Sequence, residues 1–130
     1  FEQKISNVFT FSAQATYSYG QDYAGGNLPF ISPLQYKTAV KYYQNQLTAE
    51  IAFHGNAAQA AFNPFYGEDR TASYGVFDLA LAKAFKFERI NLTAKIGAEN
   101  IFDNYYSTYT DWNNIPRMGR NVFFNLKIAI

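Results

Sequence analysis

The sequence predicts an all-β chain, an antiparallel sheet of about six strands of the kind that forms a transmembrane β-barrel. Three observations support this fold class. Several stretches alternate between apolar and polar residues with a period of two, which is typical of strands with two different faces. Short turns alternate with long loops along the chain, as in outer-membrane barrels. Tyr and Phe are abundant, at 11 and 13 of 130 residues, as in many sandwiches and barrels.

Six stretches of the sequence show the alternation of a strand. The second is the least regular, and the last is the clearest because almost every second residue up to the terminus is apolar. In that last stretch Phe123 alone departs from the pattern. The predicted strands are residues 8–19, 34–43, 47–54, 77–82, 91–99 and 122–130.

The connections between these stretches alternate in length. Residues 44–46 and 86–89 predict tight turns, whereas residues 20–33, 55–73 and 103–119 predict long loops rich in Gly, Asn, Pro and Tyr. Compact soluble domains seldom contain three irregular connections of this length. Short turns at one end of the sheet and long loops at the other favour an outer-membrane barrel.

The two faces of the predicted strands differ in character. One face is mostly apolar, with aromatic residues near the strand ends, as expected of a surface that meets lipid. The other carries charges and would face a wet or protein-filled lumen. An ordinary soluble sheet with its polar face in water remains the alternative. The charged positions are Lys37, Lys41, Glu50, Asp78, Lys95, Glu99 and Lys127, and the aromatic ones are Tyr17, Tyr19, Tyr36, Tyr42, Phe85 and Phe87.

Composition excludes several classes of function. A net charge of +1 gives no electrostatic reason to expect nucleic acid as a partner. The chain has no cysteine, so disulfides and thiolate metal sites are absent, and no apolar run approaches 18 residues. The opening residues, Phe1 to Lys4, resemble neither a start nor a signal peptide, which predicts a fragment or a processed product.

Catalysis finds little support in the sequence. His54 is the only histidine, and we interpret it as a structural or lumen-facing residue rather than a metal ligand. Glu99 and Asp103 resemble an acid–base pair, but Asn100 and Asp103 are better explained as partners of backbone groups where the strand turns. A hydrolase would need a nucleophile and a base within reach, so we predict that the chain is not an enzyme and uses no cofactor.

The long loops are the better candidates for binding, because function concentrates on loops held by a rigid scaffold. Their aromatic faces, amides and cations suit a siderophore, haem, a corrinoid or an oligosaccharide. Equally, they suit an aromatic belt with a rigid surface loop, and Arg117 and Arg120 suit the phosphates of lipopolysaccharide. The predicted ligand-binding residues are Tyr106, Tyr109, Trp112, Asn113 and Arg117 in the last loop, and Phe65, Tyr66 and Arg70 in the loop before it.

Four short motifs occur in order along most of the chain. Residues 97–106 read GAENIFDNYY, and residues 115–120, which lead into the terminal strand, read IPRMGR. Upstream, residues 28–33 read LPFISP, and residues 74–79 read YGVFDL. Together they resemble motifs of the TonB-dependent outer-membrane receptors, whose penultimate strand carries G-x-E-N-L-F-D-x-x-Y. Ser32 stands where the family has a proline, and Ile130 stands where the family ends in Phe.

The resemblance implies a barrel of about 22 strands that is filled by an N-terminal plug domain. Residues 1–130 would be its last quarter, so the plug and the earlier strands are absent from this chain. The implied function is active import of a scarce nutrient across the bacterial outer membrane with TonB-coupled energy. The implied nutrients are siderophore-iron, haem, cobalamin or an oligosaccharide.

The implied partners are the rest of the barrel and the plug, the TonB complex acting through the plug, outer-membrane lipid or lipopolysaccharide, and a small-molecule nutrient. The alternative function is a small soluble β-sheet module that recognises carbohydrate or protein through its aromatic loops.

Overall fold

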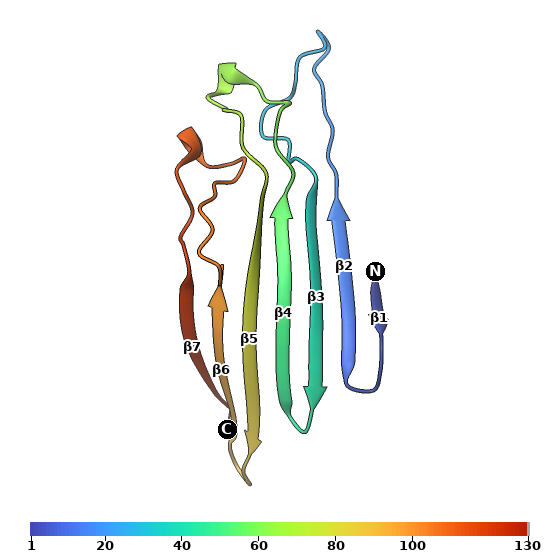
Figure 1. Ribbon diagram of the computed structural model, residues 1–130, viewed down its shortest axis with the longest axis vertical. Helices are drawn as coiled ribbons and strands as arrows, with labels where there is room; N and C mark the ends of the chain where they lie inside the picture. Colours follow the sequence, from blue (N-terminus) through green and yellow to red (C-terminus); the bar gives the residue numbers. More distant parts are fainter. Residues whose placement is uncertain (130) are drawn as a thin grey trace.

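The protein is a single antiparallel sheet of seven strands whose spatial order follows the sequence (Figure 1). A computed structural model describes residues 1–129. Two single-turn 3-10 helices, η1 (Pro64–Tyr66) and η2 (Trp112–Asn114), lie in the loops. Within the described residues, no helix has the length and apolar character needed to cross a membrane. The strands are β1 (Glu2–Lys4), β2 (Phe9–Thr16), β3 (Gln35–Gln44), β4 (Leu47–Asn56), β5 (Tyr74–Lys86), β6 (Asn91–Glu99) and β7 (Asn121–Ala129).

The predicted fold class is confirmed, with differences at the strand ends. The structure adds β1, which the sequence did not indicate, so the sheet has seven strands rather than about six. β2 ends at Thr16 instead of residue 19, whereas β4 and β5 both extend further towards the loops than predicted. The prediction about Ile130 lies outside the described residues.

Three short turns join the strands at one end of the sheet, and three long loops lie at the other end (Figure 1). The turn between β3 and β4 holds Asn45 and Gln46 at φ values of 49° and 63°. Positive φ at both central residues is the signature of the type I′ turn, whose twist matches that of the hairpin. The next turn closes with a bond from the Phe87 amide to the Ile90 carbonyl. The predicted tight turns are therefore confirmed.

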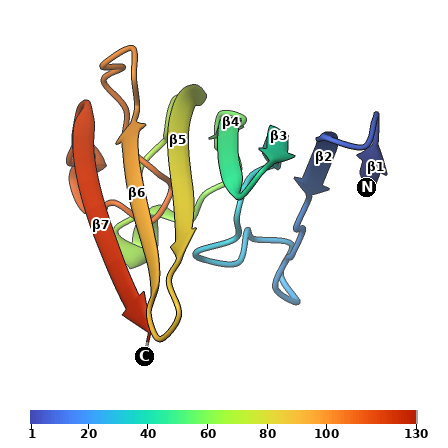
Figure 2. The same ribbon diagram turned by 90° about the horizontal axis from the view of Figure 1, so that it is seen from below.

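The strand register places most charged side chains on one face of the sheet, and Lys83, which lies opposite Leu47 and Ala94 near the turns, is an exception on the other face. Lys41 faces Glu50 across β3 and β4, and the two form an ion pair of 3.1 Å on what we call the polar face. The opposite, apolar face is bare, with Ile96 51% and Phe124 63% exposed. Figure 2 shows the sheet from below as a single curved layer, and within residues 1–129 no second sheet covers it. An uncovered apolar face on a curved, open sheet is the arrangement of a barrel segment in lipid.

Aromatic side chains gather at both ends of the apolar face. Near the loops, Tyr36, Phe53, Phe77 and Phe102 form a ladder with ring centroids 5.6, 4.6 and 5.5 Å apart. Phe77 and Phe85 on β5 are separated by about 26 Å of strand at about 3.3 Å per residue. A tilt of about 40° reduces this to about 20 Å, close to the apolar band of roughly 25 Å in known barrels. The rings thus border a surface that matches the hydrocarbon of a bilayer.

Candidate functional site

The three long loops meet at one end of the sheet, and their side chains bind one another. We call residues 17–34, 57–73 and 100–120 the first, second and third loops. The Glu68 carboxylate is buried and accepts the backbone N–H groups of Phe30 at 2.6 Å and Asn63 at 2.7 Å. Phe30 has a φ of 58°, which costs about 1–2 kcal/mol for a residue with a Cβ. Its charge-assisted bond to Glu68 offsets this cost and ties the first loop to the second.

Asparagine side chains complete the connections between loops. Asn63 donates through Nδ2 to the Asn27 carbonyl at 2.9 Å, which adds a second link between the first and second loops. Asn114 accepts through Oδ1 from the hydroxyls of Thr71 and Ser107, and its Nδ2 donates to the Arg70 carbonyl at 3.2 Å. Asn114 therefore joins the second loop to the third. The loops form one hydrogen-bonded unit above the sheet.

The start of the third loop is a turn built by Asn100 and Asp103. Asn100 accepts from the Asn104 amide at 2.9 Å and donates to the Asn104 carbonyl at 2.8 Å, and Asp103 accepts from the Arg120 amide at 2.7 Å. Both residues have positive φ, which Asn and Asp tolerate better than most residues. The predicted role of Asn100 and Asp103 in satisfying backbone groups is confirmed.

Asp111 and Arg117 form a clasp inside the third loop. The guanidinium contacts both carboxylate oxygens, at 2.6 and 2.8 Å, and Thr108 donates to the same carboxylate through its amide and its hydroxyl. Burial raises the pKa of Asp111, but the hydrogen bonds from Arg117 and Thr108 and the charge of Arg117 together lower it below its ordinary value. Asp111 in turn raises the pKa of Arg117. The clasp is therefore fully charged at neutral pH.

An aromatic cleft opens where the second and third loops meet. Its volume is about 160 Å³, and Tyr66, Tyr109 and Trp112 line it together with Phe30. Trp112 is 73% exposed, so its indole face is available to a ligand. Glu68, Asp69 and Asp111 also line the cleft, although the carboxylates of Glu68 and Asp111 already accept hydrogen bonds within the loops. Aromatic faces beside a few oxygen acceptors are typical of small-molecule sites.

The other predicted ligand-binding residues do not line this cleft. Phe65 is 95% exposed on η1, and Asn113 is exposed on η2. Tyr106 lies apart from the cleft and stacks on Tyr74 with ring centroids 4.4 Å apart. Arg117 is engaged in the clasp, and Arg70 contributes its carbonyl to Asn114. Three of the predicted residues, Tyr66, Tyr109 and Trp112, therefore line one cleft. The sequence did not indicate Phe30, Glu68 or Asp111, because their contacts join different loops or separate segments of one loop.

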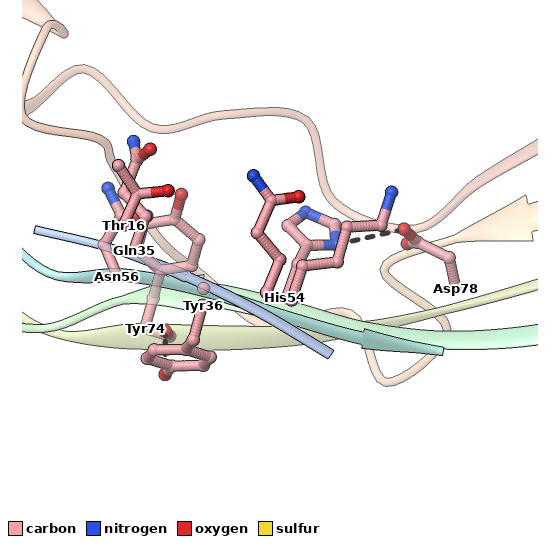
Figure 3. A pocket seen from close by; sticks show the side chains of 10 residues that line it. Thr16, Gln35, Tyr36, His54, Asn56, Tyr74 and Asp78 are labelled. Carbon is pink, nitrogen blue, oxygen red and sulfur yellow. Dashed lines mark hydrogen bonds and ion pairs between the residues drawn. The ribbon is translucent and has the colours of Figure 1, made fainter. Parts of the chain in front are cut away.

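A second pocket lies on the polar face near the loop ends of the strands. Its volume is about 360 Å³, and Figure 3 shows His54 and Asp78 on one side of the strands with the Tyr36 ring on the other. His54 Nδ1 lies 3.2 Å from Asp78, which also accepts the Asn100 amide at 3.0 Å. The register places Lys95 opposite Ala82, so Asp78 pairs with His54 and not with Lys95. Within residues 1–129 no group of three or more His, Asp or Glu residues is arranged to hold a metal ion.

Comparisons with known proteins show the fold. No protein-family model matches the sequence, and no curated protein matches it. A solved structure named "Copper transporter OprC" is similar to 98% of this chain with a TM-score of 0.80 and 22% sequence identity. This chain spans only 22% of that structure's length. The chain therefore has the fold of a β-barrel segment and matches one part of a much longer chain.

Proposed function

We propose that this chain is the C-terminal strand set of a TonB-dependent outer-membrane receptor that imports a scarce nutrient. The observation that carries the proposal is the pairing of a bare apolar face with a charged polar face under a unit of three linked loops. Lipid would cover the first face, and the remaining strands and a plug domain would complete the lumen lined by the second. The fold shared with a copper transporter supports a role in transport.

In this proposal the aromatic cleft contacts the nutrient on the outside of the cell. Tyr66, Tyr109 and Trp112 would stack on planar or ring-shaped groups, and the exposed Asn113 would supply amide hydrogen bonds. Phe65 and Arg70 belong to the same loop as Tyr66. The nutrient classes that fit these side chains are a ferric siderophore, haem, cobalamin and an oligosaccharide. The name of the similar structure adds copper to this group. No covalent bond is broken during import.

The alternative, a soluble module that binds carbohydrate or protein, is not favoured by the apolar face. Seven side chains of β5, β6 and β7 are between 45% and 66% exposed on that one surface. Soluble monomers rarely expose so continuous an apolar surface. These residues are Leu79, Leu81, Ile96, Val122, Phe124, Leu126 and Ile128.

Uptake by cells that carry or lack the full-length gene tests the proposal. The labelled probes are a ferric siderophore, haemin, cyanocobalamin, maltohexaose and Cu²⁺. We expect the uptake of one probe to require both the gene and TonB, and Trp112→Ala to lower it about tenfold. Tyr105→Ala is the control, because Tyr105 is 84% exposed but does not line the cleft. Gene-dependent uptake that persists without TonB would contradict the energy coupling, and equal loss in both variants would contradict the cleft.

A further inference from the structure

A pocket between the first and second loops remains unexplained by the proposed function. We call it the outer pocket, and its volume is about 290 Å³. The first loop supplies aromatic and aliphatic side chains, and the second loop supplies a run of four alanines interrupted by one glutamine. The residues on which the argument depends are Tyr17, Leu28, Ile31, Leu34, Ala58 and Gln59.

The outer pocket continues the apolar face of the sheet. The Ala57 amide donates to the Leu34 carbonyl at 2.8 Å, which extends the β3–β4 ladder by one step beyond the strands. Leu34 and Ala57 lie two residues from Tyr36 and Gly55, which pair on the apolar face. Because side chains two apart share a face, both residues point to the lipid side. The pocket therefore lies just beyond the aromatic ladder, at the level where the outer leaflet would meet the loops.

The walls of the outer pocket suit a hydrocarbon chain. Leu28, Ile31 and Leu34 supply branched aliphatic surface, and Ala58 contributes only a methyl group. Gly20 lies against Leu28 and Ile31, since a Cβ there would come within 2.9 Å of Leu28. No Lys, Arg, Asp or Glu is among the lining residues. A charged ligand would find no oppositely charged side chain among these residues.

Gln59 contributes a buried polar side chain to this apolar pocket. Its side chain is 3% exposed, and Nε2 donates to the Ile31 carbonyl at 3.0 Å and approaches the Ala61 carbonyl at 3.5 Å. These two acceptors fix the orientation of the amide, because the oxygen would repel them. Gln59 Oε1 is then the only buried side-chain nitrogen or oxygen atom of residues 1–129 that lacks a hydrogen-bond partner. A buried acceptor without a donor is destabilising, so a ligand that supplies a donor is favoured.

We propose that the outer pocket binds one acyl chain of an outer-leaflet lipid, whose hydroxyl or amide N–H donates to Gln59 Oε1. The apolar walls bind the chain, and the continuity with the lipid-facing surface lets it enter from the membrane. The lipid thereby holds the first and second loops together from the outside.

The test measures lipid binding to the full-length protein that contains this chain, after removal of lipid in detergent. Native mass spectrometry counts adducts with lipid A, whose chains carry amide and hydroxyl groups, and with phosphatidylcholine of equal chain length. We expect one retained lipid A and about tenfold weaker retention of phosphatidylcholine. Ala58→Leu fills the pocket and should weaken lipid A binding at least tenfold. Ala15→Leu is the matched control, an exposed alanine on the apolar face that does not line the pocket.

A heat-modifiable band on a gel shows that each variant is folded, and Ala60→Val replaces Ala58→Leu if the latter does not fold. Three results overturn the proposal. The first is equal binding of lipid A to the wild type and to the folded pocket variant. The second is equal retention of both lipids, which removes the role of Gln59. The third is displacement of the lipid by the imported nutrient, which assigns the pocket to transport instead.

Discussion

Arg117 shows how a side chain that looks available for a ligand can instead hold its own loop. Its guanidinium binds both oxygens of Asp111 and reaches the Thr108 hydroxyl at 3.2 Å, while its amide binds the Tyr106 carbonyl. A planar guanidinium fork matches a carboxylate with two parallel bonds, which lysine does not. We therefore infer that Arg117 fixes the conformation of the third loop, which places Trp112 and Tyr109 in the cleft.

The clasp predicts a specific dependence on pH. Asp111→Asn should lower the local stability of the third loop by about 1 kcal/mol, a value reduced because Arg117 is half exposed. Because the folded pKa of Asp111 is lowered, its contribution is complete above the ordinary pKa of 3.8 and is lost as the pH falls through the lowered value. Hydrogen exchange of residues 105–118 should therefore differ between wild type and variant at pH 5 to 7, and the two should converge at lower pH.

Asp69→Asn is the control for that measurement, since the Asp69 carboxylate makes no hydrogen bond or ion pair within the described chain. A difference between the wild type and Asp111→Asn that grows at low pH would show that the sign is wrong.

Gly55 and Gly75 provide a test of backbone packing in the sheet. A Cβ on Gly55 would collide with the Tyr74 carbonyl, which is backbone and also accepts the Tyr36 hydroxyl. A Cβ on Gly75 would meet only the Phe53 ring and the Tyr36 hydroxyl, which can move. We expect Gly55→Ala to cost about 1–3 kcal/mol in the free energy of unfolding and Gly75→Ala clearly less. Urea unfolding in lipid vesicles measures both, and a larger loss for Gly75→Ala would refute the assignment.

The sequence predicted residue roles best where the partners are close in the chain. Asn100, Asp103 and Asn104 lie within one turn, so their backbone contacts follow from short-range chemistry. The contact between Asp78 and His54 could not be predicted, because it depends on the register of β4 against β5. A shift of two residues between the strands would give Asp78 a different neighbour. The loop-to-loop contacts of Glu68 and Asn114 were missed for a related reason, because each binds groups in another loop that no spacing in the sequence connects.

At the scale of elements, the strand centres were predictable and the ends were not. β1 has only three paired residues, none of them apolar, so no alternation marks it. Beyond Thr16 the alternation of β2 continues through Tyr17 and Tyr19, yet β3 begins at Gln35 and offers no further partner. β5 begins earlier than its apolar pattern suggests, because Tyr74 and Gly75 pair with the end of β4. Pairing between strands, rather than the pattern of one strand, sets these limits.

Adjacent residues on β5 lie on opposite faces of the sheet, so a matched pair of substitutions can compare the lipid-facing side with the lumen-facing side. Leu81 is on the apolar face, and Ala80 is on the polar face, where three carboxylates (Glu50, Asp78 and Glu99) and two lysines (Lys37 and Lys95) line the same hollow. Leu81→Lys should cost about 2–4 kcal/mol, the price of a lysine near the bilayer centre. Ala80→Lys should cost much less, since its ammonium meets water and carboxylates. The folded fraction in outer membranes measures both, and equal tolerance of the two lysines would remove the case for a lipid-facing surface.

At the scale of the whole molecule, the sheet has two open edges. β1 pairs only with β2, and β7 pairs only with β6, within residues 1–129. Unpaired N–H and C=O groups along such edges recruit other strands, and hydrocarbon does not tolerate them. Charged side chains on the polar face pair with one another, as Lys41 does with Glu50. By contrast, no strand of the described chain pairs with the backbone N–H and C=O groups on the outer side of β7. In the proposed receptor the first strand of the barrel would do so.

The open edges and the bare apolar face predict the behaviour of the isolated chain. Residues 1–130 expressed alone in buffer without detergent should aggregate or form large oligomers. Light scattering coupled to size-exclusion chromatography measures this directly. A monodisperse monomer with a cooperative thermal transition would instead support the soluble binding module and remove the basis for the receptor.

The strict correspondence between strand order and sequence order bears on how such a sheet is made. Every strand pairs only with the strands immediately before and after it along the chain. Each new pairing therefore requires closure of a single local connection, and the entropy of closure rises only slowly with loop length. The sheet can grow by one hairpin at a time during synthesis or insertion, with its leading edge always the most recently added strand. Assembly of this region then needs no pairing between distant segments, because each hairpin forms from strands that are adjacent along the chain.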